Sequence, residues 1–168
     1  MIVSAHSQGT VLAVAALHRL PTATRGNVHL VTYGSPIGML YAKAFPSQYP
    51  GLVQKLVTEP PPDTPLSGDG LEGALASWRN FYRMSDPIGS TIDELGPATS
   101  SPSNIAPRFA NAELADPLKV DPGRDDATGN DVAIPLEWDR SSHDPMARHS
   151  SYLADPNLRQ YVAARKAQ

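Results

Sequence analysis

The chain has 168 residues, and 40% of them are hydrophobic, which is enough for one domain around a single core. Lys and Arg number 14 against 17 Asp and Glu, and no basic run stands out, so a nucleic-acid partner is not expected. Cys is absent, which excludes disulfides and thiolate chemistry. No apolar stretch approaches the roughly 20 residues of a membrane-spanning helix. No basic segment precedes an apolar one at Met1, so we expect no signal peptide and, by default, a cytoplasmic location.

The N-terminal stretch predicts a strand followed closely by a helix. Ile2 and Val3 are β-branched and apolar, which is typical of a buried strand. The run from Thr10 to Leu17 predicts a helix, which Pro21 ends. A short turn that contains a serine therefore lies between the predicted strand and the predicted helix.

This turn has the sequence Ala5-His6-Ser7-Gln8-Gly9. A strained turn that presents a serine hydroxyl needs small residues two positions before and after the serine, and Ala5 and Gly9 meet that need. Ser7 is therefore the candidate nucleophile. The backbone N–H of Gln8 lies at a helix N-terminus, where partial positive charge can stabilise an oxyanion. We expect His6 to shape or pack the turn rather than to act as a base.

The motif Ala-His-Ser-Gln-Gly resembles the Gly-x-Ser-x-Gly nucleophile elbow of α/β-hydrolases, with Ala5 in place of the first glycine. Residues 28–33 predict the next parallel strand, and the phrase Val-Thr-Tyr-Gly-Ser-Pro-Ile-Gly looks like the one after the sixth strand of class 3 lipases. The resemblance implies a partial α/β-hydrolase fold, an α/β architecture whose mostly parallel sheet holds strands five to eight between helices.

The position of the elbow carries a further expectation. In the resembling family the elbow follows the fifth strand, whereas here it begins at Ala5. We therefore expect residues 1–168 to form one domain that is an N-terminally truncated, C-terminal half of the fold. The strand at residues 1–5 would then be an apolar sheet edge, and a second chain is one candidate for covering it.

Three later segments have weaker patterns. Residues 38–70 are open to two interpretations, a cap or lid over the site, or a crossover loop with one helix. Residues 96–130 are rich in Pro, Asp, Ser and Gly and predict an irregular loop. Residues 132–138 predict a last strand at a sheet edge, because Pro135 is tolerated at an edge and not at the centre of a sheet.

The run Trp78–Met84 predicts a third parallel strand with Asp86 near its C-terminal end, where reactive groups gather in open α/β sheets. In the resembling lipases an Asp-Pro at this point supplies the acid of the catalytic triad. The alternative is that Asp86 only forms the turn before a proline. Asp93 and Glu94 are rivals for the acid, but neither lies at the end of a predicted strand.

Two histidines near the C-terminus are candidates for the general base. His149 is followed at three residues by Tyr152 and matches the His-x-x-Tyr pattern that ends many lipases. A last helix is predicted directly afterwards, with Asp155 as N-cap and Pro156 in its first position. His143 is the alternative base, and either histidine has the alternative of being a solvated loop residue.

The order Ser7, Asp86, His149 is that of α/β-hydrolases. The resemblance implies a lipase or esterase that cleaves an ester or lipid-like small molecule through an acyl-enzyme. It also implies a second oxyanion donor from a loop that this chain lacks, so weak activity of the isolated chain is expected. No cofactor is expected, and no metal site, because the histidines lack paired spacing. The alternatives are a non-catalytic remnant or binding module, and a thioesterase or acyltransferase with the same triad.

Overall fold

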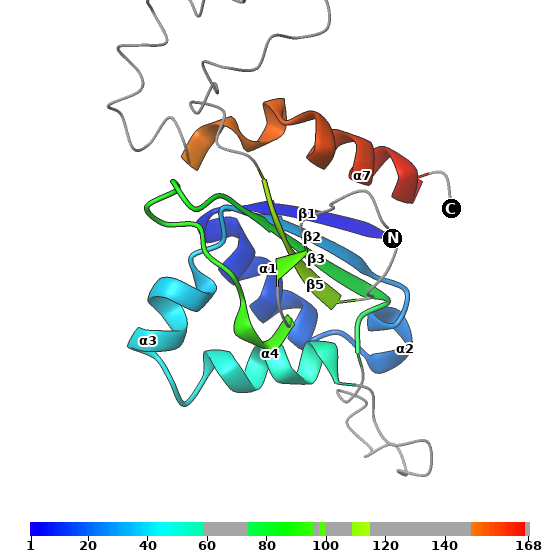
Figure 1. The fold of residues 1–168 in the computed structure, drawn as a ribbon. Coiled ribbons are helices and arrows are strands. Elements are labelled where there is room, and N and C mark those ends of the chain that lie inside the picture. The colour runs from blue at the N-terminus through cyan, green and yellow to red at the C-terminus, as the bar shows by residue number, and fades with distance from the viewer. Residues whose placement is uncertain (59–73, 96–97, 100–108, 115–148, 167–168) are drawn as a thin grey trace, which may run out of the picture.

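The computed structural model describes residues 1–58, 74–95, 98–99, 109–114 and 149–166, and these form a parallel sheet with helices on both faces (Figure 1). The elements, in chain order, are β1 (Ile2–His6), α1 (Gln8–His18), α2 (Thr22–Arg25), β2 (His29–Tyr33), the π-helical turn η1 (Ile37–Tyr41), α3 (Ala42–Ala44), α4 (Tyr49–Val57), β3 (Ser77–Tyr82), the 3₁₀ turn η2 (Asp93–Leu95), β4 (Ala98–Thr99), β5 (Phe109–Glu113), the 3₁₀ turn η3 (Ser151–Ala154) and α7 (Pro156–Lys166).

Among the described residues, the sheet has five strands in the order β1-β2-β3-β5-β4, and every neighbouring pair is parallel. Parallel neighbours need crossover connections, and α1 supplies the one between β1 and β2. The prediction of an α/β architecture with a parallel sheet is confirmed. The register places Thr32 opposite Asn80, and Asn80 opposite Asn111, so one row of side chains crosses three strands.

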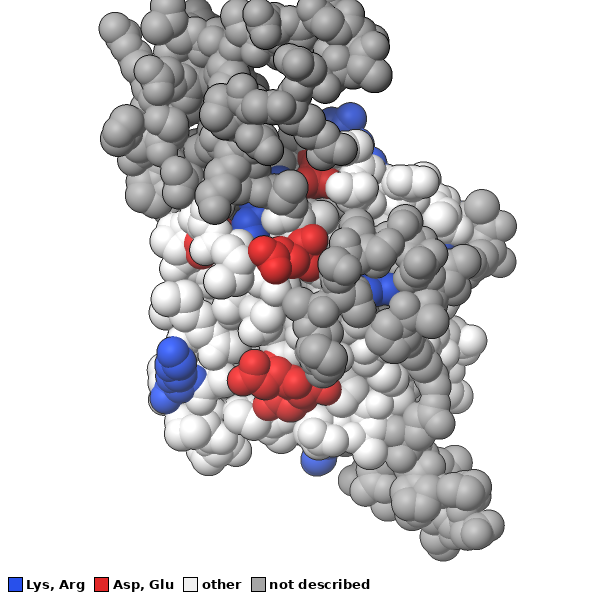
Figure 2. Space-filling model, viewed as in Figure 1, with Lys and Arg blue, Asp and Glu red and all other residues white. Residues whose placement is uncertain are grey.

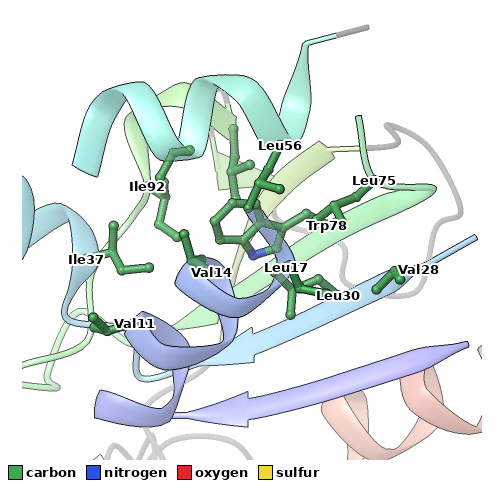
Figure 3. Packing of buried hydrophobic residues seen from close by; sticks show 12 residues of the cluster. Val11, Val14, Leu17, Val28, Leu30, Ile37, Leu56, Leu75, Trp78 and Ile92 are labelled. Atoms are coloured by element: carbon green, nitrogen blue, oxygen red, sulfur yellow. The ribbon is translucent and has the colours of Figure 1, made fainter. Parts of the chain in front are cut away.

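Alternation along the strands assigns each side chain to one of two hydrophobic layers. Leu30 and Trp78 belong to the cluster that also contains buried residues of α1 and α4. Figure 3 shows this cluster, with the Trp78 indole between the sheet and α4. Val31, one position after Leu30, and Phe81, three positions after Trp78, therefore point to the opposite face and belong to the second cluster with Tyr161 of α7. The sheet is therefore buried on both faces, as parallel sheets require.

Several predicted elements agree with the structure. The helix predicted from Thr10 is α1, which begins earlier, at Gln8, directly after Ser7. The strands predicted over 28–33 and 78–84 are β2 and β3. The predicted cap of the last helix is confirmed, because the Asp155 carboxylate accepts the N–H of Asn157 at 2.9 Å.

The interpretation of residues 96–130 as an irregular loop is wrong at two places, one of which lies within residues 109–114, where the sequence has a modest apolar pattern. Phe109–Glu113 is β5, which pairs along its length with β3, and Ala98–Thr99 is the short edge strand β4. Most residues of β5 are alanine, asparagine or glutamate, which are depleted in strands, so local propensity hid it. Pairing with a buried strand overrides that preference. The other residues of 96–130, and the strand predicted over 132–138, lie outside the described residues.

Within residues 38–70, the described part contains η1, α3 and α4. Val53 and Leu56 of α4 are buried in the same cluster as Val14 of α1, so this helix is a layer of the core. Residues 59–70 lie outside the described part. Over the described residues, no helix is both long enough and apolar enough to cross a membrane. On the face drawn in Figure 2, the visible Lys and Arg side chains lie apart from one another.

Candidate active site

Ser7 lies in a strained turn between β1 and α1. Its φ of 51° and ψ of −131° make it the only non-glycine residue with a positive φ in the described part of the chain. The Ser7 N–H donates to the Tyr33 carbonyl at the end of β2, at 3.1 Å. The Ser7 carbonyl accepts two hydrogen bonds from Thr10, one from its backbone N–H at 2.9 Å and one from the Thr10 hydroxyl at 2.7 Å. These bonds hold the serine at the C-terminal edge of the sheet.

Gln8 begins α1, so its N–H is among those at a helix N-terminus that intrahelical bonds leave without a partner. The partial positive charge at this helix end favours an anion beside Ser7. A Cβ built at Gly9 meets nothing within 4 Å, so there is room for alanine, another small residue, at this position.

His149 brings the predicted nucleophile and the predicted acid together. Its Nε2 lies 2.7 Å from Ser7 Oγ, and its Nδ1 lies 2.9 Å and 3.0 Å from the two oxygens of Asp86. With Nδ1–H donated to the carboxylate, Nε2 is free to accept the serine proton. The side chains of His149 and Asp86 are buried, being 3% and 5% exposed as residues. Three residues from distant parts of the sequence therefore form one hydrogen-bonded series.

The Asp86 carboxylate is held by several donors besides His149. The N–H of Ile88 donates to Oδ1 at 2.8 Å, the N–H of Gly89 donates to the same carboxylate, and the Tyr152 hydroxyl donates to Oδ2 at 2.8 Å. Burial by itself raises the pKa of Asp86, but the hydrogen bonds from Gly89, Ile88, His149 and Tyr152 outweigh it and hold that pKa below its ordinary value. The carboxylate is therefore charged beside the imidazole.

Tyr152 connects the acid to the C-terminal helix. Its hydroxyl also accepts the N–H of Arg83 at 3.0 Å, and the Arg83 guanidinium lies over its ring, 4.2 Å from the ring centroid. Arg83 forms an ion pair with Asp155, the N-cap of α7, at 3.4 Å. Burial, followed by the charge of Asp86, raises the pKa of Tyr152, so its hydroxyl stays protonated as a donor. The sequence patterns did not single out Arg83, because an arginine at the end of an aromatic-rich run gives no local sign of the tyrosine and the aspartate that it contacts.

His6, for which we predicted a packing role in the turn, contacts the residue predicted as the base. Its Nε2–H donates to the backbone carbonyl of His149 at 2.8 Å. Its ring stacks on Tyr33 with centroids 5.2 Å apart and lies 4.8 Å from the His149 ring. His6 therefore contacts the backbone and the ring of His149, and the structure shows no hydrogen bond from His6 to Ser7 within the described residues.

Two glycines allow the close approach of these groups. Gly34 has a φ of +58°, and a Cβ there would lie 3.0 Å from His149 Cε1 and 3.0 Å from Tyr152 Cε2. A Cβ at Gly89 would collide with the Asp86 carboxylate and with Gly34 Cα. Side chains at either position would push the base and the acid apart.

The other candidates do not join this series. Asp93 and Glu94 lie in η2, and no bond from either to His149 occurs in the described residues. His143 lies outside the described residues. In the part of the chain that the structure describes, no three His, Asp or Glu side chains are grouped to hold a metal ion. A cavity of about 250 Å³ lies beside β1 and α7; its lining includes Ser4, Tyr33 and Leu158 but not Ser7, Asp86 or His149.

Comparisons of this chain with protein-family models, with curated proteins and with solved structures found no match. The chemistry must therefore be inferred from the site itself. A serine hydroxyl that donates to an imidazole, whose other nitrogen is bound to a carboxylate, can lose its proton as it attacks an electrophilic carbon.

Proposed function

We propose that this chain is a serine hydrolase of the α/β-hydrolase type, which cleaves carboxylic esters through an acyl-enzyme. One observation carries the proposal: the series in which Ser7 Oγ lies 2.7 Å from His149 Nε2 while His149 Nδ1 is bound to Asp86. A buried carboxylate that orients a histidine, which in turn contacts a serine in a strained turn, is the arrangement of an activated nucleophile.

The surrounding fold supports the same proposal. Ser7 follows β1, and Asp86 follows β3, so both lie beyond the carboxyl ends of parallel strands, where such sheets place their reactive groups. The turn from β1 into α1 has the strand–turn–helix form of a nucleophile elbow, with Ser7 at positive φ. The order of the three residues along the chain agrees with this class of hydrolase.

In the first half of the proposed reaction, Ser7 Oγ attacks the ester carbonyl carbon and its proton passes to His149 Nε2. Asp86 stabilises the imidazolium and keeps Nδ1–H directed at itself. The N–H of Gln8, at the helix N-terminus, donates to the oxyanion of the tetrahedral intermediate. Collapse of this intermediate breaks the ester C–O bond, and the alcohol leaves with the proton from His149.

In the second half, water attacks the acyl-enzyme and gives a proton to His149 Nε2. The second tetrahedral intermediate expels Ser7 Oγ, which recovers its proton from the imidazolium, and the carboxylic acid is released. Every proton therefore moves between Ser7, His149, the substrate and the attacking water. Asp86 remains a carboxylate throughout, which agrees with the lowering of its pKa.

The proposal is tested by labelling the chain with a fluorophosphonate probe and by measuring hydrolysis of p-nitrophenyl butyrate. The parent chain should be labelled on Ser7 and should release p-nitrophenol, and both signals should vanish in Ser7→Ala. Ser4→Ala is the matched control, because Ser4 is an exposed serine of β1 outside the series and its loss should change neither signal. Absence of labelling in a folded parent sample would contradict the proposal.

The same assay separates esterases from enzymes that use the same acyl-enzyme. Esters and thioesters of one acyl group, compared by kcat/KM, report whether the alcohol or the thiol leaving group is preferred. Preference for the ester supports a carboxylic ester hydrolase. Preference for the thioester, or acyl transfer to an added alcohol in place of water, would overturn the assigned reaction and leave the series of Ser7, His149 and Asp86 in place.

A further inference from the structure

A row of buried polar side chains crosses the sheet beneath the acid. It consists of Thr32, Asn80 and Asn111, which are register neighbours on β2, β3 and β5, and we name it the polar row. All three residues are fully buried, at 0% exposure. They lie on the face of the sheet that elsewhere carries Leu30 and Trp78. Apolar residues would suit this face, and buried amides are costly unless every polar atom has a partner.

Within the sheet the polar row is connected side chain to side chain. The Thr32 hydroxyl donates to Asn80 Oδ1 at 2.9 Å, and the Trp78 indole N–H donates to that hydroxyl at 2.9 Å. Asn80 Nδ2 donates to Asn111 Oδ1 at 2.9 Å. These bonds fix the rotamers of the two amides and direct their remaining groups away from the sheet.

The remaining groups of the polar row bind the backbone of residues 86–92, which we name the acid segment. Asn80 Nδ2 also donates to the Ser90 carbonyl at 2.9 Å. Asn111 binds Ile92 twice, because its Oδ1 accepts the Ile92 N–H and its Nδ2 donates to the Ile92 carbonyl, both at 2.8 Å. Two asparagines thus hold three backbone groups of a segment without regular structure.

The held end of the acid segment is adjacent to the donors of the Asp86 carboxylate. Gly89, directly before Ser90, gives its N–H to Asp86, and Ile88 does the same at 2.8 Å. Ser90 is fixed from the other side, because its N–H donates to the Ser35 carbonyl at 3.1 Å. A shift at Ser90 would therefore move the two N–H groups that orient the carboxylate.

We propose that Asn80 and Asn111 are positioning residues, which hold the acid segment so that the Asp86 carboxylate faces His149 Nδ1; this rests on the function proposed above. Leucine at either position would fill the space but would leave backbone groups of Ser90 or Ile92 buried without these partners. The acid segment would then move to find others. Gly89 has no room to absorb the movement, because it already lies against Asp86 and Gly34.

The test compares Asn80→Leu and Asn111→Leu with Ser77→Ala. Ser77 is buried on β3 and its hydroxyl is hydrogen-bonded to His29 Nδ1 at 2.8 Å, outside the polar row, so it is a matched control for the loss of a buried side-chain hydrogen bond. With p-nitrophenyl butyrate, kcat should fall roughly 10- to 100-fold in both asparagine variants, while KM stays within about threefold. Ser77→Ala should keep kcat within about threefold of the parent.

The pH profile separates positioning from a general loss of stability. A carboxylate that no longer faces the imidazole stabilises the imidazolium less, so the acid limb of kcat/KM should move to lower pH in Asn80→Leu and Asn111→Leu. It should not move in Ser77→Ala. An unchanged profile and an unchanged kcat in folded asparagine variants would overturn the proposal. If Asn111→Leu does not fold, Asn111→Ala carries the same expectations without added bulk.

A spectroscopic readout keeps this inference separate from the proposed function. The proton of His149 Nδ1–H, shared with a buried carboxylate, should give a low-field ¹H NMR signal in the parent chain, and the Asp86→Asn variant identifies it. That signal should weaken or move upfield in Asn111→Leu and persist in Ser77→Ala. If the parent hydrolyses no ester, the proposed function fails, while persistence of the signal in Asn111→Leu contradicts the positioning by the polar row.

Discussion

The two ends of the hydrogen-bonded series are built in different ways. Ser7 is positioned within one strand–turn–helix unit, where its carbonyl binds Thr10 three residues later and its N–H binds the neighbouring strand. His149 and Asp86 are 63 residues apart and depend on Tyr152, the acid segment and α7 for their placement. The nucleophile is therefore a product of local sequence, whereas the acid and the base are products of packing between distant segments.

This difference predicts how the site fails. Changes in the packing of the acid segment or of α7 should impair the histidine and the carboxylate while the serine turn keeps its geometry. Substitutions near Ser7 that cause no steric overlap should have little effect on activity or stability. The following variants test this difference, from the largest expected effect to the smallest.

Asp86→Asn should cause the largest loss among changes outside Ser7 and His149. The amide cannot stabilise an imidazolium and favours the wrong tautomer of His149, so kcat for p-nitrophenyl butyrate should fall on the order of 10³- to 10⁴-fold. Steady-state kinetics measures the loss, and circular dichroism checks that the fold persists. Asp93→Asn is the control, because Asp93 is exposed in η2, and it should keep parental activity. A small loss in Asp86→Asn would argue against an acid in this position.

Tyr152→Phe should have an intermediate effect. The variant removes the hydroxyl that donates to Asp86 and accepts from Arg83, so we expect about tenfold lower kcat and about 1–3 kcal/mol lower free energy of unfolding. Urea unfolding and steady-state kinetics measure the two effects. Tyr82→Phe is the matched control, a buried tyrosine whose hydroxyl contacts Glu113 rather than the site. Equal losses of kcat in both variants would contradict a specific role for Tyr152.

Alanine should be tolerated at Gly9, the glycine of the serine motif, and should be harmful at Gly34, which lies outside that motif. Gly9→Ala meets open space and lies in α1, so the free energy of unfolding should stay unchanged or rise by up to about 1 kcal/mol, with fluorophosphonate labelling retained. Gly34→Ala has a positive φ and would crowd His149 and Tyr152, so it should lower that free energy by about 1–3 kcal/mol and slow labelling. If Gly9→Ala lowered stability and labelling more than Gly34→Ala, steric crowding at the serine turn, rather than packing between distant segments, would control the geometry of the site.

Sequence patterns anticipated much of this molecule where the signal is short-range. Ile2 and Val3, the turn at Ser7 and the apolar run after it predicted β1 and α1, because strand and helix preferences act over a few residues. Asp86 and His149 were selected by type, order and position beside a strand or helix end. No short stretch of the sequence shows that Asp86 and His149 contact each other, because they are 63 residues apart.

What the patterns did not predict depends on tertiary contacts. Residues of β5 have low strand preference and pair with β3 only because that strand is already buried. The asparagines of the polar row were not predicted as functional, since an Asn in a strand pattern has no local signal for the backbone it binds. Arg83 was missed for the same reason.

The sequence by itself determined the parallel α/β architecture, the serine turn and the short set of candidate acids and bases, because hydrophobic periodicity, capping and residue chemistry are properties of neighbouring residues. The sequence favoured Asp86 over Asp93 and Glu94, but only the tertiary structure decided that its carboxylate contacts His149 and that Tyr152 and the polar row support it. Those contacts join segments tens of residues apart, and only burial of both faces of the sheet brings them within hydrogen-bonding distance.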